Sequence, residues 1–139
     1  MKFQRPSILT YQETIRFHGH NGPFLAMGYK LGKYINEKHK YKGIMDIIIK
    51  VKVKPVKPFT CIIDGLQCST FATLGKGNMM VEKSRGKDIT VFVVADKRKY
   101  TYHITGKAMD ICLGAEDLHK AAKKIFRTPF SQLFNLSLP

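Results

Sequence analysis

Ile44-Met45-Asp46-Ile47-Ile48-Ile49-Lys50-Val51-Lys52-Val53-Lys54 is a run whose second half alternates apolar and basic side chains. Successive side chains of a β-strand point to opposite faces, so this period of two predicts a strand over residues 44–54. Pro55 and Pro58 end the strand, because proline cannot donate a ladder hydrogen bond. One face should be buried and the other should carry lysines. The buried face would consist of Ile47, Ile49, Val51 and Val53.

Further strand patterns follow this run. Residues 78–83 give a weaker strand signal, and Ile89 to Val94 give a stronger one. Residues 96–99 are polar and indicate a turn, after which residues 100–105 form the returning strand of a hairpin.

Helical periodicity lies on both sides of these strands. Residues 7–16 predict a short helix with Ser7 as a possible N-cap. Pro23 suits the first turn of a second helix, which should end near Lys38. A last helix is predicted over residues 115–127, where Pro129 stops it. Helices at both ends of a block of strands predict an α+β fold with an antiparallel central sheet.

Two segments keep alternatives open. The apolar run from Phe59 to Ile63 fits either a second strand or the lead into a helix over roughly 64–72. The tail from Phe130 to Pro139 is rich in Phe and Leu, and we expect it to pack on the body or on a second subunit.

Length and composition narrow the class of protein. A chain of 139 residues with 44% hydrophobic residues predicts a single domain, residues 1–139, with a sizeable core. No apolar run is long enough to span a membrane, and the basic N-terminus leads into no apolar signal segment. The three cysteines do not resemble a disulfide framework, which favours the cytoplasm.

The chain carries 24 basic and 10 acidic residues, a net charge of +14. Such an excess could serve a nucleic acid, an anionic membrane surface or a small anionic molecule. The basic residues are spread along the sequence and most are lysines, whereas bidentate recognition of phosphates and bases favours arginine. We therefore expect neither a nucleic-acid partner nor a membrane partner.

The residues with the most chemistry lie in two distant stretches. Phe17-His18-Gly19-His20-Asn21-Gly22-Pro23 holds two imidazoles, and Cys61-Ile62-Ile63-Asp64-Gly65-Leu66-Gln67 holds a thiol. His18, His20 and Cys61 are candidate ligands of one transition metal. The alternative is two histidines in ordinary hydrogen bonds and a cysteine buried as a small apolar residue.

Three further residues are candidates for contacts around such a site. Asp64 and Gln67 share one face if their segment is helical, and could orient a water or a substrate amide. Asp64 could equally be an N-cap. Lys76, between two glycines, could hold a carboxylate or phosphate, although Leu74-Gly75-Lys76-Gly77-Asn78 also fits a tight turn into a strand.

These stretches, in this order, resemble the FmdE family, which takes its name from formylmethanofuran dehydrogenase, over roughly residues 10–105. The matching blocks are Phe17 to Tyr29, Cys61 to Gln67 and Leu74 to Asn78. The resemblance implies an α+β domain that forms a homodimer. It also implies a site where the two stretches meet around a transition metal such as zinc.

The chain departs from the family pattern at two thiols. Gly22 stands where the family has the cysteine that follows the His-Gly-His block, and Ala72 stands where it has the cysteine of Gly-Cys-Thr. The C-terminal zinc ribbon of some relatives is also absent from this sequence.

Three functions follow from these observations. The first is a metal-binding protein or metal-dependent enzyme of one-carbon or methanogenic metabolism, with His18, His20 and Cys61 as ligands. The second is a degenerate accessory protein that binds a small anionic ligand or cofactor through Lys76 without metal. The third, a nucleic-acid binder, is the least favoured of the three.

Overall fold

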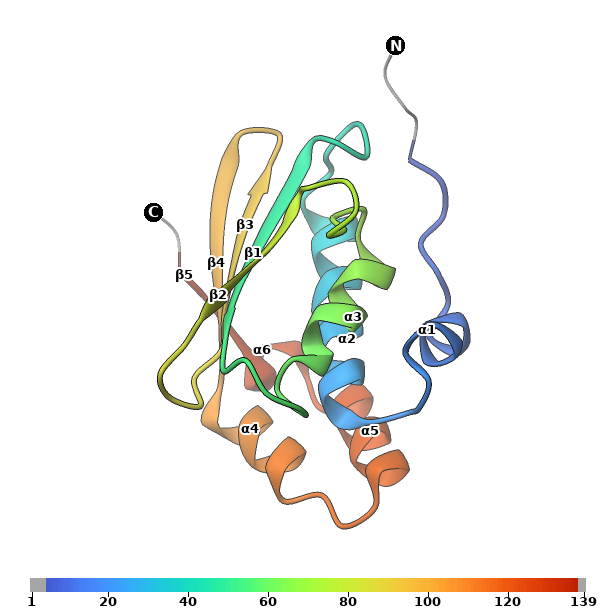
Figure 1. The fold of residues 1–139 in the computed structure, drawn as a ribbon, viewed down its shortest axis with the longest axis vertical. Coiled ribbons are helices and arrows are strands. Elements are labelled where there is room, and N and C mark those ends of the chain that lie inside the picture. The colour runs from blue at the N-terminus through green and yellow to red at the C-terminus, as the bar shows by residue number, and fades with distance from the viewer. Residues whose placement is uncertain (1–4, 138–139) are drawn as a thin grey trace.

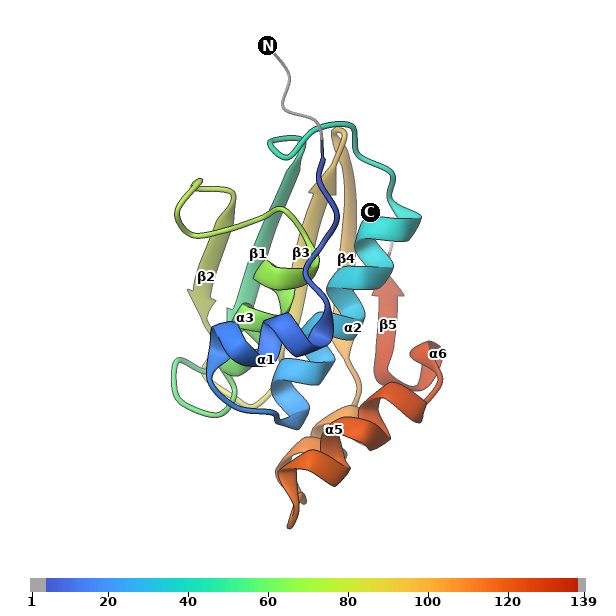
Figure 2. The same ribbon diagram turned by 90° about the vertical axis from the view of Figure 1, so that its right-hand side faces the viewer.

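A computed structural model describes residues 5–137 and gives the α+β fold that the periodicity predicts. A five-stranded sheet lies against a layer of helices, with α2 (Pro23–Lys38) and α3 (Cys61–Ser69) next to the sheet and α1 (Tyr11–His18) outside them (Figure 1). Turning the molecule brings the helices in front of the sheet (Figure 2). The helices therefore cover one face of the sheet and leave the other open.

The sheet has the strand order β2-β1-β3-β4-β5. Its strands are β1 (Ile47–Val53), β2 (Met79–Lys83), β3 (Thr90–Ala95), β4 (Arg98–Ile104) and β5 (Phe134–Ser137). All neighbouring pairs are antiparallel except β1 and β2, which are parallel because α3 carries the chain back between them.

Burial along β1 follows the predicted alternation. Ile47, Ile49, Val51 and Val53 are fully buried, whereas Ile48 and Lys52 on the open face are exposed. Side chains from α2 and α3 complete the core, among them Leu31, Ile35 and Leu66. Burying each large apolar side chain stabilises the fold by about 1.5–3 kcal/mol.

Helices α2 and α3 pack with their backbones almost in contact. A Cβ atom at Gly28 would overlap the carbonyl oxygen of Ile62, and a Cβ atom at Gly65 would overlap that of Leu25. Gly32 faces the Ser69 side chain equally closely. We call Gly28, Gly32 and Gly65 the glycine seam. Because the backbones meet directly at Gly28 and Gly65, the seam fixes the relative position of the two helices.

Several boundaries differ from the predicted ones. Helix α1 begins at Tyr11 with Thr10 as its N-cap, not Ser7, because Thr10 and Glu13 form a reciprocal capping box. Residues 59–63 do not form a strand but lead into helix α3, which begins at Cys61. The last long helix, α5 (Leu118–Arg127), begins later than predicted because the Asp117 side chain caps it.

The region after β4 holds elements that the pattern did not predict. Helix α4 (Gly106–Leu113) begins at the Thr105 cap. In the tail, the short helix α6 (Phe130–Leu133) leads into β5, which pairs with β4. The tail thus packs on the body as expected, while residues 138–139 lie outside the described residues.

Asn78 ties the loop after α3 to the sheet. Its amide nitrogen donates to the carbonyl oxygens of Ile44, Ile47 and Phe71, and its carbonyl oxygen accepts from the Thr73 N–H. The side chain is 4% exposed. It therefore closes the loop that follows α3 over the end of β1.

Within residues 5–137 no helix is both long and apolar enough to cross a membrane.

Candidate metal centre

The two candidate histidine ligands flank a sharp break between two helices. His18 is the last residue of α1, and Gly19 follows it with a left-handed backbone, φ 109°. Glycine adopts this conformation without strain, so α1 can end and the chain can turn within one residue. The turn brings the two imidazole rings together, with their centroids 4.7 Å apart.

The candidate thiol ligand comes from the first residue of α3. One ligating atom each from His18, His20 and Cys61 lies within 4.8 Å of the others, and within the described chain no other group of His, Cys, Asp or Glu gathers in this way. The two distant stretches of sequence therefore meet as predicted. His20 is exposed, whereas His18 and Cys61 are half-buried.

The two nitrogens of the His18 ring have opposite surroundings. Nδ1 lies 2.6 Å from Oδ2 of Asp64, a hydrogen bond that fixes the orientation of the ring. Nε2 is buried and has no hydrogen-bond partner, the one such side-chain atom among residues 5–137. A buried polar nitrogen without a partner costs about 1–3 kcal/mol, a penalty that a bound ion would remove.

Asp64 is itself held in place. Gln67, one turn further along α3, donates from Nε2 to Oδ1 of Asp64 at 3.3 Å. The Gln67 Oε1 atom accepts from the Leu74 N–H at 2.8 Å. Asp64 lies inside the first turn of α3 rather than at its N-cap, which is Thr60. A chain of hydrogen bonds thus runs from the loop after α3 to the His18 ring.

Lys76 lies in that same loop but makes its contacts locally. Its Nζ atom donates to Oγ1 of Thr73 at 2.9 Å, and Gly77 follows with a left-handed backbone, φ 79°. Burial lowers the pKa of the Lys76 ammonium below its ordinary value. The segment therefore forms the tight turn into β2, and anion binding by Lys76 remains a prediction.

The donor set fits zinc. Imidazole nitrogens and a thiolate are the ligands zinc prefers, and three protein ligands leave one position open. Ligand atoms that share one zinc ion lie about 3.5 Å apart, so the three ligand atoms, which lie within 4.8 Å of one another, would move together by roughly 1 Å on binding. A carboxylate behind a ligating histidine, as Asp64 stands behind His18, is the usual orienting partner.

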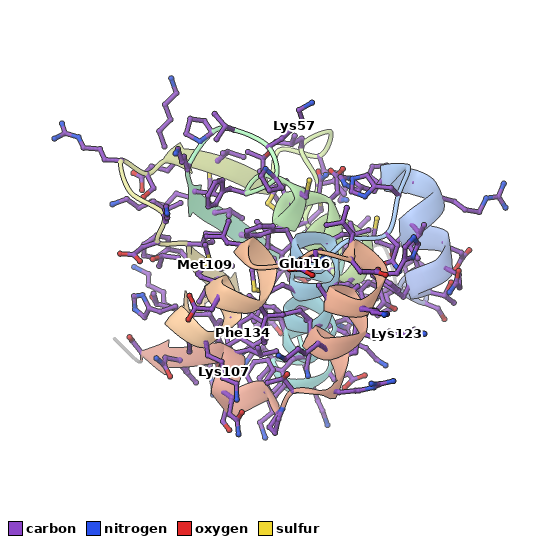
Figure 3. All side chains as sticks on the ribbon, turned by 90° about the horizontal axis from the view of Figure 1, so that it is seen from below. Lys57, Lys107, Met109, Glu116, Lys123 and Phe134 are labelled. Carbon is purple, nitrogen blue, oxygen red and sulfur yellow. The ribbon has the colours of Figure 1, made fainter. Side chains whose placement is uncertain are left out.

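The Cys61 thiol has competing influences. Burial raises its pKa above the ordinary value and the Asp64 carboxylate raises it further, whereas the ammonium of Lys57 lowers it. Lys57 lies on the segment just before α3 (Figure 3). A metal ligand must be the thiolate, so an ion bound here would displace the thiol proton.

A small apolar hollow adjoins the cluster. Its volume is about 60 Å³, and its walls include Phe24, Pro58, Cys112 and Leu118, with His20 and Cys61 at one side. About two water molecules would fill such a volume. Cys112, on α4, is 6% exposed, as expected of a core residue, but no local pattern indicates that α4 and α5 wall this hollow. Because the walls of the hollow come from residues far apart in the chain, no sequence motif predicts it.

The two positions without the family thiols lie in different places. A Cβ atom at Gly22 would lie 3.4 Å from Cε1 of His20, so a side chain at this position would adjoin the candidate ligands. Ala72 is fully buried beyond the far end of α3, which Cys61 begins. Since nine residues of helix span about 13 Å, a thiol at position 72 could not join the same ion.

This arrangement defines an α+β protein with a histidine–histidine–cysteine cluster between the starts of two packed helices. The model of the FmdE family, described as molybdenum formylmethanofuran dehydrogenase operon, matches residues 17–135, and the chain belongs to this family. The matched range contains every candidate ligand and continues past the hairpin into β5. Comparison with curated proteins gave no significant match.

Proposed function

We propose that the protein binds one divalent transition metal ion, zinc, through His18, His20 and Cys61. The observation that carries this proposal is the buried Nε2 atom of His18, which has no hydrogen-bond partner while Asp64 fixes the opposite side of the ring. An ordinary structural histidine would satisfy both nitrogens. Metal binding accounts for the one that remains.

The protein's own residues would set the properties of this centre. Asp64 would hold His18 in the tautomer that presents Nε2. The exposed side chain of His20 would leave the centre open to solution, and the apolar hollow would admit only a small group beside Cys61. A zinc ion held there would supply Lewis acidity toward a carbonyl group or water.

The substrate we propose is a one-carbon unit at the oxidation level of a formyl group. A hollow of about 60 Å³ with mainly apolar walls suits a group of that size better than a larger one. The family description names the operon of a formylmethanofuran dehydrogenase, which agrees in chemical class. An assay with formyl donors would distinguish a protein that turns the unit over from one that carries it for another enzyme.

The test is elemental analysis of the untagged protein purified under reducing conditions. We expect close to one zinc per chain, and we expect the His18→Ala and Cys61→Ala variants to lose it. The His119→Ala variant is the matched control, because His119 is exposed, lies outside the cluster and forms a hydrogen bond with Asn21 rather than with a candidate ligand.

A chain that holds no metal after reconstitution would contradict the proposal. The loss of the thiol at Gly22 would then have disabled the centre. The remaining function would be a metal-free accessory protein, and a screen of small anionic ligands against Lys76→Ala would follow.

A further inference from the structure

The fold gathers basic side chains at one end of the molecule that the sequence places far apart. Lys38 and Lys40 lie at the end of α2, and Arg98 begins β4 after the β3–β4 turn. All three line one hollow of about 380 Å³, together with His39, Asp96 and Tyr100. We call this the basic hollow. In Figure 1 the C-terminal end of α2 and the turn between β3 and β4 lie at the same end of the molecule.

The basic hollow lies away from the candidate metal centre. His20 and Gly22 precede the first residue of α2, whereas Lys38 is its last. The helix has 16 residues and therefore spans about 24 Å between the two places. A ligand in the basic hollow would not touch His18, His20 or Cys61.

An imidazole and a phenol form the floor of the basic hollow. The ring of His39 stacks on that of Tyr100, with centroids 3.7 Å apart and planes 19° from parallel. The Nε2 atom of His39 shares a hydrogen bond with the hydroxyl of Tyr102, which is fully buried. These contacts fix the orientation of the His39 ring, which is one of the residues that line the hollow.

The charge around this floor is positive. Lys38, Lys40 and Arg98 contribute three cations against the single carboxylate of Asp96. Burial and the nearby Lys38 lower the pKa of His39, so the positive charge comes mainly from the lysines and the arginine. Part of the lysine charge offsets the partial negative charge at the carbonyl end of α2. The excess that remains, with a forked guanidinium among the cations, suits oxyanions.

We propose that the basic hollow binds phosphate groups, with Lys38, Lys40 and Arg98 as the charged contacts and His39 as a hydrogen-bonding contact. The volume accommodates a short polyphosphate or the phosphates of a nucleotide. A nucleic-acid backbone carries the same chemistry. The two sources share the contacts but differ in salt dependence, because a polyanion releases condensed counterions when it binds.

The experiment is calorimetric titration of the full chain with inorganic tripolyphosphate and, separately, with single-stranded oligothymidine. Lys40→Glu and Arg98→Glu test the hollow. Lys123→Glu is the matched control, since Lys123 is equally exposed and lies on the outer side of α5 (Figure 3). All three variants change an exposed residue, so we expect the fold to tolerate them.

We expect Lys40→Glu and Arg98→Glu to weaken tripolyphosphate binding by about tenfold or more, and Lys123→Glu to leave it within about twofold. If oligothymidine binds and tripolyphosphate does not, with the same two variants affected and a steep salt dependence, the phosphates belong to nucleic acid. Absence of saturable binding of either probe would overturn the proposal. An equal loss in Lys123→Glu would also overturn it, because general charge would then account for the binding.

Zinc content provides an independent readout. It should not change in Lys40→Glu or Arg98→Glu, because the basic hollow and the candidate metal centre lie at opposite ends of α2. A chain that binds tripolyphosphate but no zinc would retain this inference and lose the proposed function.

Discussion

The two ring nitrogens of His18 differ, because one forms a hydrogen bond and the other does not. Its Nδ1 atom pairs with Asp64, and its Nε2 atom is buried without a partner. The carboxylate holds the ring in one orientation. Under the proposed function the two residues would have different roles, with His18 as a ligand and Asp64 as its support.

Asp64→Asn should weaken zinc binding by about 10–100-fold, because the amide keeps the shape but not the charge that orients and polarises His18. Competition against a zinc-binding dye would measure the change. Asp110→Asn, an exposed carboxylate on α4, is the matched control and should bind as the wild type does. Wild-type affinity in Asp64→Asn would mean that the Asp64 carboxylate does not support a metal ligand.

Gly22→Cys should tighten zinc binding, on the order of tenfold or more, because it adds a thiolate beside His20. Gly22→Ala is the control, since it adds a Cβ atom at an ordinary contact distance of 3.4 Å from the imidazole but no ligand. Ala72→Cys should have no such effect, because position 72 lies beyond the far end of α3. The same dye competition compares the three variants, and equal affinities in Gly22→Cys and Gly22→Ala would refute the placement.

At the scale of elements, helices α2 and α3 act as one unit that sets the position of the candidate centre. The first turn of α2 follows His20, and the first turn of α3 supplies Cys61 and Asp64. The glycine seam fixes the distance between these two turns. An error in helix packing would therefore move ligands as well as core residues.

Gly65→Ala should destabilise the protein by about 1–3 kcal/mol or more, because its Cβ atom would overlap the backbone of α2. Gly75→Ala is the matched control and should change the free energy of unfolding by less than about 0.5 kcal/mol, since nothing lies within 4 Å of its added Cβ atom. Urea denaturation followed by circular dichroism measures both. Equal stabilities would show that the helices can separate without cost.

The elements that the sequence predicts best are those with local signals. The helix from Pro23 to Lys38 is confirmed at both ends, because proline at its first turn and a continuous apolar stripe are encoded within the segment. Helix α4 is not predicted because it starts at a glycine and, with eight residues, is too short to show a clear helical period. The parallel pairing of β1 with β2 depends on the path of α3 between them, which no local pattern contains.

In the candidate site, too, the sequence predicts the features with local motifs and does not predict those that depend on the fold. The motifs predict that His18, His20 and Cys61 meet, and the three are close together. They do not predict that Lys76 makes its side-chain contact within its own loop, to Thr73. They also do not predict that Gly22 rather than Ala72 adjoins the ligands, because that depends on the length of α3.

At the scale of the whole molecule, exposed apolar side chains and net charge have opposite effects on the association of two copies. The open face of the sheet carries exposed apolar side chains such as Ile48 and Met80, which favour association. The net charge of +14 opposes the approach of two copies. Any homodimer must therefore gain enough apolar contact to exceed this repulsion.

We predict a homodimer whose population increases with salt, because added ions screen the repulsion between the two basic chains. Light scattering at low and moderate ionic strength would measure it, with an expected mass approaching twice the 15.8 kDa of one chain. A mass of one chain at both salt concentrations, over a range of protein concentrations, would contradict the prediction.

The glycine seam also determines which substitutions a second mutation can rescue. At Gly28 and Gly65 the atoms in the way belong to the backbone of the opposite helix, so no change of a neighbouring side chain can make room. At Gly32 the nearest atom is the hydroxyl of Ser69, which a Ser69→Gly replacement would remove. The double variant Gly32→Ala/Ser69→Gly should therefore recover most of the lost stability, since only the Thr70 methyl group, 3.1 Å from the added Cβ atom, would have to shift. Over evolutionary time, positions 32 and 69 can therefore change together. At Gly28 and Gly65, nearer the candidate metal ligands, no second substitution can compensate for an added side chain.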